Sequence, residues 1–259
     1  MNTSRRARYR ITHETRYRYA ANVTLSQQLL HLQPRDMPYQ TCIAKKLTIS
    51  PEPSYSTSSQ DSFGNPCTRL EFNQPHRELV VIAEMDVDVF TRDVATRFET
   101  SPAWEEMVSA CLYRGHVALT GDFLEALFRF ESPFVHLKHQ FSDYAQDCFF
   151  KDRPLLVAIQ ALMSKIYHEF TFDPEATHIG TPLLEVLEKK RGVCQDFAHL
   201  MLACLRSLGL PARYVSGYLL TNPPEGQARL IGADASHAWV SAYCCLLYTS
   251  PSPRDRTRS

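Results

Sequence analysis

The stretch GVCQDFAHL, residues 192–200, gives the strongest indication of the fold. Apolar residues continue after it at helical spacing, which predicts a helix over residues 197–208. Gly209 and Pro211 follow directly, and a glycine cap followed by proline is typical of a helix end. Cys194 is therefore expected where a loop turns into the first turn of this helix.

Cys194 is a candidate nucleophile because of this position. Unpaired backbone N–H groups and the helix dipole at a helix N-terminus favour an anion, and the thiolate is the nucleophilic form of cysteine. The same N–H groups can stabilise the oxyanion of an acyl intermediate. The competing interpretation is a small core residue, since most cysteines are buried.

His237 is the candidate base. It lies in the stretch DASHAWV, residues 234–240, which follows a strand-like hairpin. A neutral imidazole beside a thiol forms the ion pair that activates cysteine enzymes. The competing interpretation is that His237 is one of ten ordinary histidines. Trp239 is predicted to be a core residue, although it could also shield the site from water.

Three neighbours of the nucleophile receive structural interpretations. Gln195 and Asp196 are predicted to hold the helix start through bonds from side chain to backbone. His199 is predicted to pack or to make a structural hydrogen bond. Gly192 is expected to allow a close approach of the backbone to a substrate.

Outward from this helix, the chain alternates between helix and strand signals. Strands are predicted over residues 213–220 and 236–243, and a helix over residues 155–170. Two further helices are predicted to begin at Ser101-Pro102, with serine as the cap, and at Thr181-Pro182. The second half of the chain is therefore predicted to be mixed α and β.

The first 90 residues have a β pattern. Apolar residues alternate with polar ones from Leu79 to Val89, with Asp86 and Asp88 on the opposite face. The sequence Phe-Gly-Asn-Pro at residues 63–66 predicts a turn between strands. Short strands separated by such turns predict a small antiparallel sandwich.

Composition narrows the function classes. The chain has 259 residues, with 28 Lys and Arg against 28 Asp and Glu, so its formal net charge is zero. That balance argues against nucleic acid or an anionic membrane as partner. No apolar run is long enough to span a membrane and no secretory signal is apparent, so we expect a cytoplasmic protein with reduced thiols.

The eight cysteines show no metal-binding or redox spacing. A redox or metal protein is therefore the weakest interpretation of the chain, and we expect no metal site.

Together, three segments resemble the transglutaminase-like superfamily in order, spacing and context. They are residues 192–200, the stretch LGLPARYVSGY at residues 208–218, and SHAWV at residues 236–240. Residues 8–89 resemble the β region that precedes this core in many bacterial members. The resemblance covers residues 8–244.

This resemblance implies an α+β fold. It implies an N-terminal antiparallel β-sandwich-like region over residues 1–95, a helical connector over 96–150, and a papain-like transglutaminase core over 151–244. In that core the nucleophile helix packs on an antiparallel sheet. The core is expected to be incomplete at its C-terminus, with residues 245–259 as a non-native tail.

The resemblance also implies the chemistry. Cys194 would be the nucleophile and His237 the base in acyl transfer from an amide or peptide bond through a thioester. Transfer to water makes a protease or amidase, and transfer to an amine makes a cross-linking enzyme. A protein or peptide substrate and no organic cofactor are implied. The alternative is a non-catalytic interaction module with a degenerate core.

The chain departs from the family after Cys244. Family members continue to a strand with a catalytic Asp, whereas residues 245–255 here are similar to an in-frame translation of a sequencing-library adaptor. Asp255 lies in a polar setting and is not expected to replace the missing residue. Without a buried carboxylate the orientation of His237 is not fixed, so we expect this chain to be impaired and its sheet to lack a strand.

Overall fold

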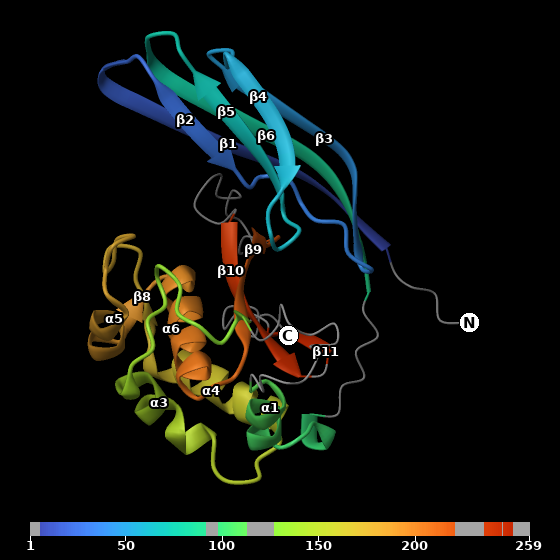
Figure 1. Ribbon diagram of the computed structural model, residues 1–259, viewed down its shortest axis with the longest axis vertical. Helices are drawn as coiled ribbons and strands as arrows, with labels where there is room; N and C mark the ends of the chain where they lie inside the picture. The colour runs from blue at the N-terminus through green and yellow to red at the C-terminus, as the bar shows by residue number, and fades with distance from the viewer. Residues whose placement is uncertain (1–5, 92–97, 113–126, 221–235, 245, 251–259) are drawn as a thin grey trace, which may run out of the picture. The chain divides into compact units, whose positions relative to one another are not determined.

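The computed structural model describes residues 6–91, 98–112, 127–220 and 236–244, together with the backbone of 246–250. The chain divides into two compact units, residues 1–95 and 96–259, which are the N-terminal unit and the C-terminal unit below (Figure 1). Each unit has its own cluster of buried apolar residues. In the described ranges no helix combines the length and apolar character needed to cross a lipid bilayer.

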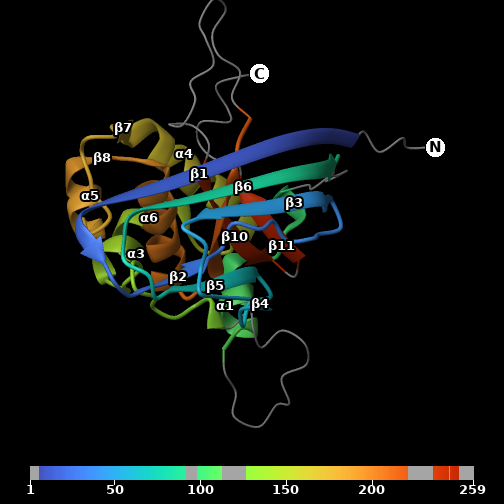
Figure 2. The same ribbon diagram turned by 90° about the horizontal axis from the view of Figure 1, so that it is seen from above.

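The N-terminal unit consists of two antiparallel sheets of three strands, which Figure 2 shows as separate layers. The strand orders are β1-β6-β3 and β2-β5-β4. The strands are β1 (Arg6–Val23), β2 (Ser26–Leu30), β3 (Gln40–Ser50), β4 (Tyr55–Gln60), β5 (Pro66–Phe72) and β6 (His76–Phe90). Leu70 and Phe72 from one sheet pack against Leu79 and Val81 from the other. The predicted antiparallel sandwich is therefore confirmed.

Strand β6 follows the predicted alternation closely. Leu79, Val81, Ala83, Met85 and Val87 are all buried, as the period of two requires. The turn before β5 also matches its prediction. Asp61 Oδ1 accepts the backbone N–H groups of Phe63 and Asn65 across the loop, and Gly64 has φ +75°.

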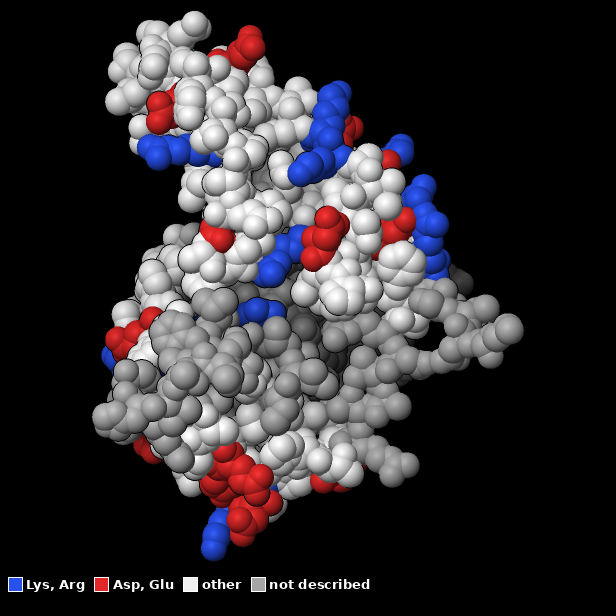
Figure 3. All heavy atoms as spheres, turned by 45° about the vertical axis from the view of Figure 1, so that its right-hand side comes forward, with Lys and Arg blue, Asp and Glu red and all other residues white. Residues whose placement is uncertain are grey.

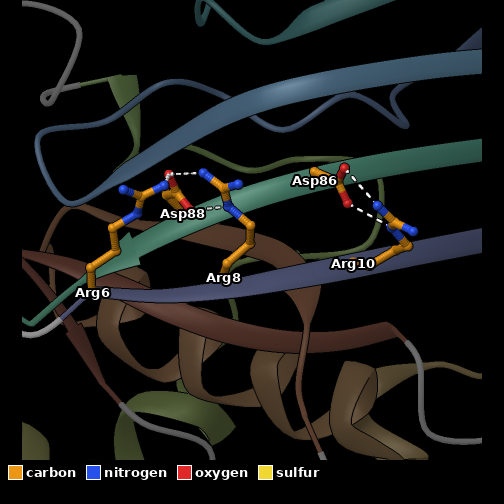
Figure 4. Close-up of polar contacts among 5 residues, drawn as sticks. All are labelled: Arg6, Arg8, Arg10, Asp86 and Asp88. Atoms are coloured by element: carbon orange, nitrogen blue, oxygen red, sulfur yellow. Dashed lines mark hydrogen bonds and ion pairs between the residues drawn. The ribbon is translucent and has the colours of Figure 1, made fainter.

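The opposite face of β6 differs from the expectation in one residue, because Asp88 is also buried. Its side chain is only 3% exposed and lies between two arginines of β1, as Figure 4 shows. Arg8 donates from Nε to Asp88 Oδ1 at 2.8 Å and from Nη2 to Oδ2 at 3.1 Å, and Arg6 adds an ion pair. Figure 3 shows acidic and basic side chains lying beside one another on this unit.

The C-terminal unit contains helices packed on a three-stranded antiparallel sheet of order β11-β10-β9. Its helices are η1 (Phe98–Thr100), α1 (Trp104–Ala110), α3 (His139–Ala145), η2 (Gln146–Cys148), α4 (Leu155–Glu169), α5 (Leu183–Lys189) and α6 (Cys194–Ser207). Its strands are β7 (Thr171–Phe172), β8 (Arg191–Gly192), β9 (Ala212–Tyr218), β10 (Ser236–Cys244) and β11 (Leu246–Ser250). The α+β class predicted from the sequence is confirmed.

Helix α6 is the centre of this unit. Nine of its residues are buried, and the helix packs against β9 and β10. It ends as predicted, because Gly209 has φ +83° and donates to the carbonyl of Arg206 at 2.9 Å, while Leu210 donates to Leu205 at 2.9 Å. This pair of bonds satisfies carbonyls that the last turn would otherwise leave open.

One predicted helix cap is wrong. Ser101 was expected to cap the helix that follows it, but α1 begins at Trp104 with Ala103 at the cap position. The Ser101 hydroxyl instead accepts the backbone N–H of Leu156 at 3.0 Å, in the first turn of α4. Helix α4 has no side-chain cap of its own at Pro154, so a serine distant in sequence supplies the acceptor.

The segment predicted as a non-native tail contributes to the sheet. We expected the sheet to lack a strand here, but residues 246–250 form β11 and pair antiparallel with β10, from Cys244 opposite Leu246 to Val240 opposite Ser250. Strand β10 is therefore flanked on both sides. The predicted substitute carboxylate, Asp255, lies outside the described residues.

Candidate active site

Cys194 is the first residue of α6, and the chain that leads into it is fixed by backbone bonds. Strands β7 and β8 pair in parallel just before the helix. Thr171 donates to the carbonyl of Lys190 at 2.9 Å, and Asp173 donates to the carbonyl of Gly192 at 2.9 Å. The position of the sulfur at the helix N-terminus is therefore set by two elements rather than by a loose loop.

Asp196 holds the start of α6, as predicted. Its Oδ2 accepts the backbone N–H of Val193 at 2.8 Å, which satisfies one of the open donors of the first turn. It also accepts the Thr177 hydroxyl at 2.6 Å, and the residue is only 8% exposed. The corresponding prediction for Gln195 stays a prediction.

Gly192 has a role that the sequence did not predict, whereas the expected approach of a substrate stays a prediction. A Cβ at this position would lie 2.6 Å from Asp196 Oδ2, far inside a normal contact. The glycine therefore leaves room for the carboxylate that caps α6, and this contact is a sufficient reason for a residue without a side chain.

Cys194 is half-buried, with apolar neighbours on one side. In contrast, Cys67, Cys148 and Cys204 are buried, and burial raises the pKa of the Cys204 thiol far above its ordinary value. The residue Cys194 is thus more exposed than these three cysteines, as a nucleophile that meets a substrate must be.

His237 is the second residue of β10 and lies opposite Gly217 of β9. Its ring packs edge-on against Trp239, with 5.1 Å between the ring centroids. Gly217 allows this arrangement, because a Cβ there would lie 3.1 Å from the Trp239 ring. His237 itself is 6% exposed. Trp239, predicted to be core, is half-buried beside the candidate base.

The two predicted residues belong to elements that pack directly on each other, since α6 contacts both β9 and β10 (Figure 1). Tyr214 of β9 links the sheet to α6, because its ring lies 5.0 Å from the ring of His199. Burial, with smaller contributions from the negative charges of Cys194 and Asp196, raises the pKa of Tyr214 to about 12. Tyr214 therefore lies within electrostatic range of the thiol.

Sequence reasoning missed Tyr214 and Thr177 as neighbours of this site. Tyr214 stood inside a motif that identified the family, but its strand phase alone did not show that it faces the helix start. Thr177 lies in a loop with no local pattern that would point to Asp196. Both contacts depend on how the helix packs, which periodicity does not specify.

His199 packs in an aromatic environment, in agreement with its predicted role. Its ring stacks on Phe134 and lies against Tyr214. Among the described residues, no group of His, Cys, Asp and Glu side chains has an arrangement that could hold a metal ion.

Comparisons with known proteins agree with this architecture. The model of the bacterial transglutaminase-like N-terminal region matches residues 9–88, and the model of the transglutaminase-like superfamily matches residues 142–251. An uncharacterised protein of Mycobacterium tuberculosis is 40% identical over 239 residues, which cover 91% of this chain and 73% of the relative. A protein of Mycobacterium leprae is 30% identical over 239 residues, covering 91% of this chain and 79% of the relative.

A solved structure shows the same fold. It is the crystal structure of a candidate cysteine protease from Cytophaga hutchinsonii, with a TM-score of 0.68 and 21% identity. The match covers 93% of this chain and 74% of that protein. On the family matches and the mycobacterial relatives, this chain belongs to the bacterial transglutaminase-like proteins, with their N-terminal region followed by a transglutaminase-like core.

Proposed function

We propose that this protein is a thiol enzyme that transfers acyl groups from amide or peptide bonds, with Cys194 as nucleophile and His237 as base. The observation that carries the proposal is the position of Cys194, which is half-buried at the first residue of a long, buried helix. Membership of the transglutaminase-like family supports the same assignment.

The first turn of α6 suits a thiolate. The N-terminal end of a helix carries a partial positive charge from its open N–H groups, and this favours the anion over the neutral thiol. The Asp196 carboxylate accepts the N–H of Val193, the residue before Cys194. The remaining N–H groups of the turn are then suited to receive the oxyanion of a tetrahedral intermediate.

The proposed reaction has two halves. The Cys194 sulfur attacks the amide carbonyl carbon, and a C–S bond forms as the carbonyl oxygen becomes an oxyanion. His237 gives a proton to the amide nitrogen, and the C–N bond breaks. The amine departs, and the acyl group stays on Cys194 as a thioester. Water or a second amine, deprotonated by His237, then attacks the thioester and regenerates the thiolate.

We take hydrolysis of a protein or peptide as the default outcome. A protein with the same fold is described as a candidate cysteine protease, and this supports transfer to water over transfer to an amine. The proposal requires no organic cofactor. The predicted impairment of this chain stays a prediction, because residues 251–259 lie outside the described part of the structure.

The proposal is tested by the rate at which iodoacetamide alkylates each cysteine, followed by peptide mass spectrometry. Cys194 is expected to react at least tenfold faster than Cys42 and Cys111, which are also half-buried. His237→Ala is expected to remove this advantage, because the imidazole no longer draws the proton from sulfur. His168→Ala, an exposed histidine on α4, serves as the control.

Turnover is measured in parallel with a fluorescent casein, with and without a primary amine. Release of soluble peptides that disappears in Cys194→Ala supports hydrolysis, and amine incorporation supports cross-linking. Equal alkylation of Cys194, Cys42 and Cys111, together with no turnover, would favour the non-catalytic interaction module instead.

A further inference from the structure

Three aromatic rings form a stack at the side of the nucleophile helix. The rings of Phe134 and His199 are nearly parallel, with centroids 5.6 Å apart and 8° between their planes. The His199 and Tyr214 centroids are 5.0 Å apart at 39°. Phe134 is 51% exposed and Tyr214 is 36% exposed. Both outer members of the stack therefore present ring surface to solvent.

A single buried arginine fixes the elements that carry these rings. Arg206 lies on α6, the helix of His199, and is only 7% exposed. Its Nε donates to the carbonyl of Ala212 at 2.9 Å, at the start of the strand that carries Tyr214. Its Nη1 donates to the carbonyl of Phe130 and to the Ser132 hydroxyl, each at 3.1 Å. The stack is thus built on a rigid base.

The segment with Phe134 is also closed on itself. Ser132 and Val135 exchange backbone hydrogen bonds of 3.0 and 2.9 Å across a tight turn that presents Phe134 at its tip. A half-exposed phenylalanine held at the tip of an ordered turn keeps its position without being buried. This arrangement differs from that of a core residue, which gains its order from burial.

The stack lies close to the candidate nucleophile. Tyr214 is near enough to Cys194 for the charge of the thiolate to affect its hydroxyl. His199 follows Cys194 on the same helix, and burial lowers the pKa of its ring, so the centre of the stack is uncharged near neutral pH. The centre of the stack thus lies on the nucleophile helix, five residues or about 7.5 Å of helix rise from Cys194.

We propose that Phe134, His199 and Tyr214 form a subsite that binds an aromatic side chain of the acyl substrate, next to the amide that Cys194 attacks. This inference rests on the proposed function. Aromatic rings prefer offset or edge-on partners with centroids 4.5–7 Å apart, and the exposed faces of Tyr214 and Phe134 offer such contacts. The substrate class is then a peptide or amide with an aromatic residue near the acyl group.

The test compares two reagents at the same sulfur. Iodoacetamide carries no side group, whereas N-benzyl iodoacetamide places a phenyl ring a few atoms from the reacting carbon. The measured quantity is the alkylation rate of N-benzyl iodoacetamide at Cys194 divided by that of iodoacetamide. This ratio is then divided by the same ratio for glutathione. The result is expected to be roughly 2 to 10, the range given by one aromatic contact. N-butyl iodoacetamide is expected to show a smaller advantage.

Substitutions assign the effect to the stack. Tyr214→Ala is expected to reduce the benzyl advantage to near unity, whereas Tyr214→Phe keeps the ring and is expected to keep the advantage. Tyr167→Ala is the matched control, because Tyr167 is 38% exposed and also packs on a histidine, at 5.1 Å, but on α4. Phe134→Ala is a second variant, whose half-exposed position makes correct folding the expected result.

The outcomes separate this inference from the proposed function. The ratio compares reagents at one sulfur, so it is measurable even if Cys194 proves no more reactive than the other thiols, which would overturn only the proposed enzyme. A fast Cys194 with no benzyl advantage, an equal advantage for the butyl reagent, or an advantage that survives both Tyr214→Ala and Phe134→Ala would overturn the subsite.

Discussion

Two carboxylates are buried among the described residues, one in each unit, and they are satisfied in different ways. Asp88 in β6 is held by the guanidinium groups of Arg6 and Arg8. Asp196 in α6 accepts only neutral donors, the N–H of Val193 and the hydroxyl of Thr177. The first arrangement is a charge pair across a sheet, and the second is a helix cap.

The difference shows two uses of a buried carboxylate. Asp88 stabilises the pairing of two strands, and Asp196 positions the start of a helix. The arginines at Asp88 join β1 to β6 across a face that also carries the Arg10–Asp86 pair. At Asp196 the two donors are neutral, and they belong to the loop and the helix start that place Cys194. Neutral donors fix the position of the helix start without placing a cationic side chain beside the thiol.

The largest expected effect is at the cap. Asp196→Ala removes the acceptor of two buried donors, so the free energy of unfolding of the C-terminal unit is expected to fall by about 2 kcal/mol. Both tryptophans, Trp104 and Trp239, lie in this unit, so urea unfolding followed by tryptophan fluorescence reports on it directly. Asp143→Ala, an exposed aspartate on α3, is the control, and an equal loss in both variants would contradict the cap.

Gly192→Ala tests the same contact from the other side. The added methyl would lie 2.6 Å from Asp196 Oδ2, so we expect a loss of about 1 to 2 kcal/mol from crowding. Gly180→Ala is a matched control, because its Cβ would meet His178 at an ordinary 3.5 Å. In an Asp196→Ala background the cost of Gly192→Ala is expected to fall, because the contact with Oδ2 is removed and only the 3.0 Å contact with the Cβ of residue 196 remains. Simple additivity of the two losses would refute the proposed contact.

The cap also illustrates which parts of this molecule the sequence could predict. The helix over 197–208 and its glycine end were predictable, because apolar spacing and a left-handed residue are local properties of the chain. The alternation in β6 was predictable for the same reason. Asp196 was predicted to hold the helix start, since the carboxylate stands three residues after the residue whose N–H it accepts.

Contacts between distant segments were not predictable. Ser101 resembled the cap of the next helix, yet its hydroxyl serves α4 because tertiary packing brings that helix start closer. The burial of Asp88 required two arginines from another strand, and single-strand alternation placed this residue only on the polar face. The aromatic neighbours of His199 come from two other segments, which no period on α6 reveals.

The charge pair at Asp88 predicts a pH dependence confined to the N-terminal unit. Arg8 and Arg6 together lower the pKa of Asp88 from 3.8 to about 2, and the hydrogen bonds from Arg8 are the largest cause. A depressed carboxyl pKa adds stability that is complete above the unfolded value near 3.8 and is lost as pH falls through about 2. The stability of this unit is therefore expected to decline between these two values.

The measurement is urea unfolding followed by far-UV circular dichroism at several pH values, with tryptophan fluorescence as the separate report on the other unit. Asp88→Asn is expected to lower the midpoint near pH 5 and to flatten the decline between pH 4 and pH 2. If the variant and the parent lose stability in parallel over that window, Asp88 is not the group responsible.

The smallest effect is expected at Arg10→Ala, which compares an exposed ion pair with a buried one. Arg10 binds Asp86 through the same two bonds, 2.8 and 3.1 Å, by which Arg8 binds Asp88 (Figure 4). The two aspartates differ in exposure, because the Asp86 side chain is 26% exposed and that of Asp88 is 3% exposed, and Asp88 has Arg6 as a second partner. Solvent screening is expected to leave the urea midpoint of Arg10→Ala unchanged, whereas Arg8→Ala lowers it. Equal shifts in the two variants would mean that bond geometry, rather than removal from water, determines the strength of these cross-strand pairs.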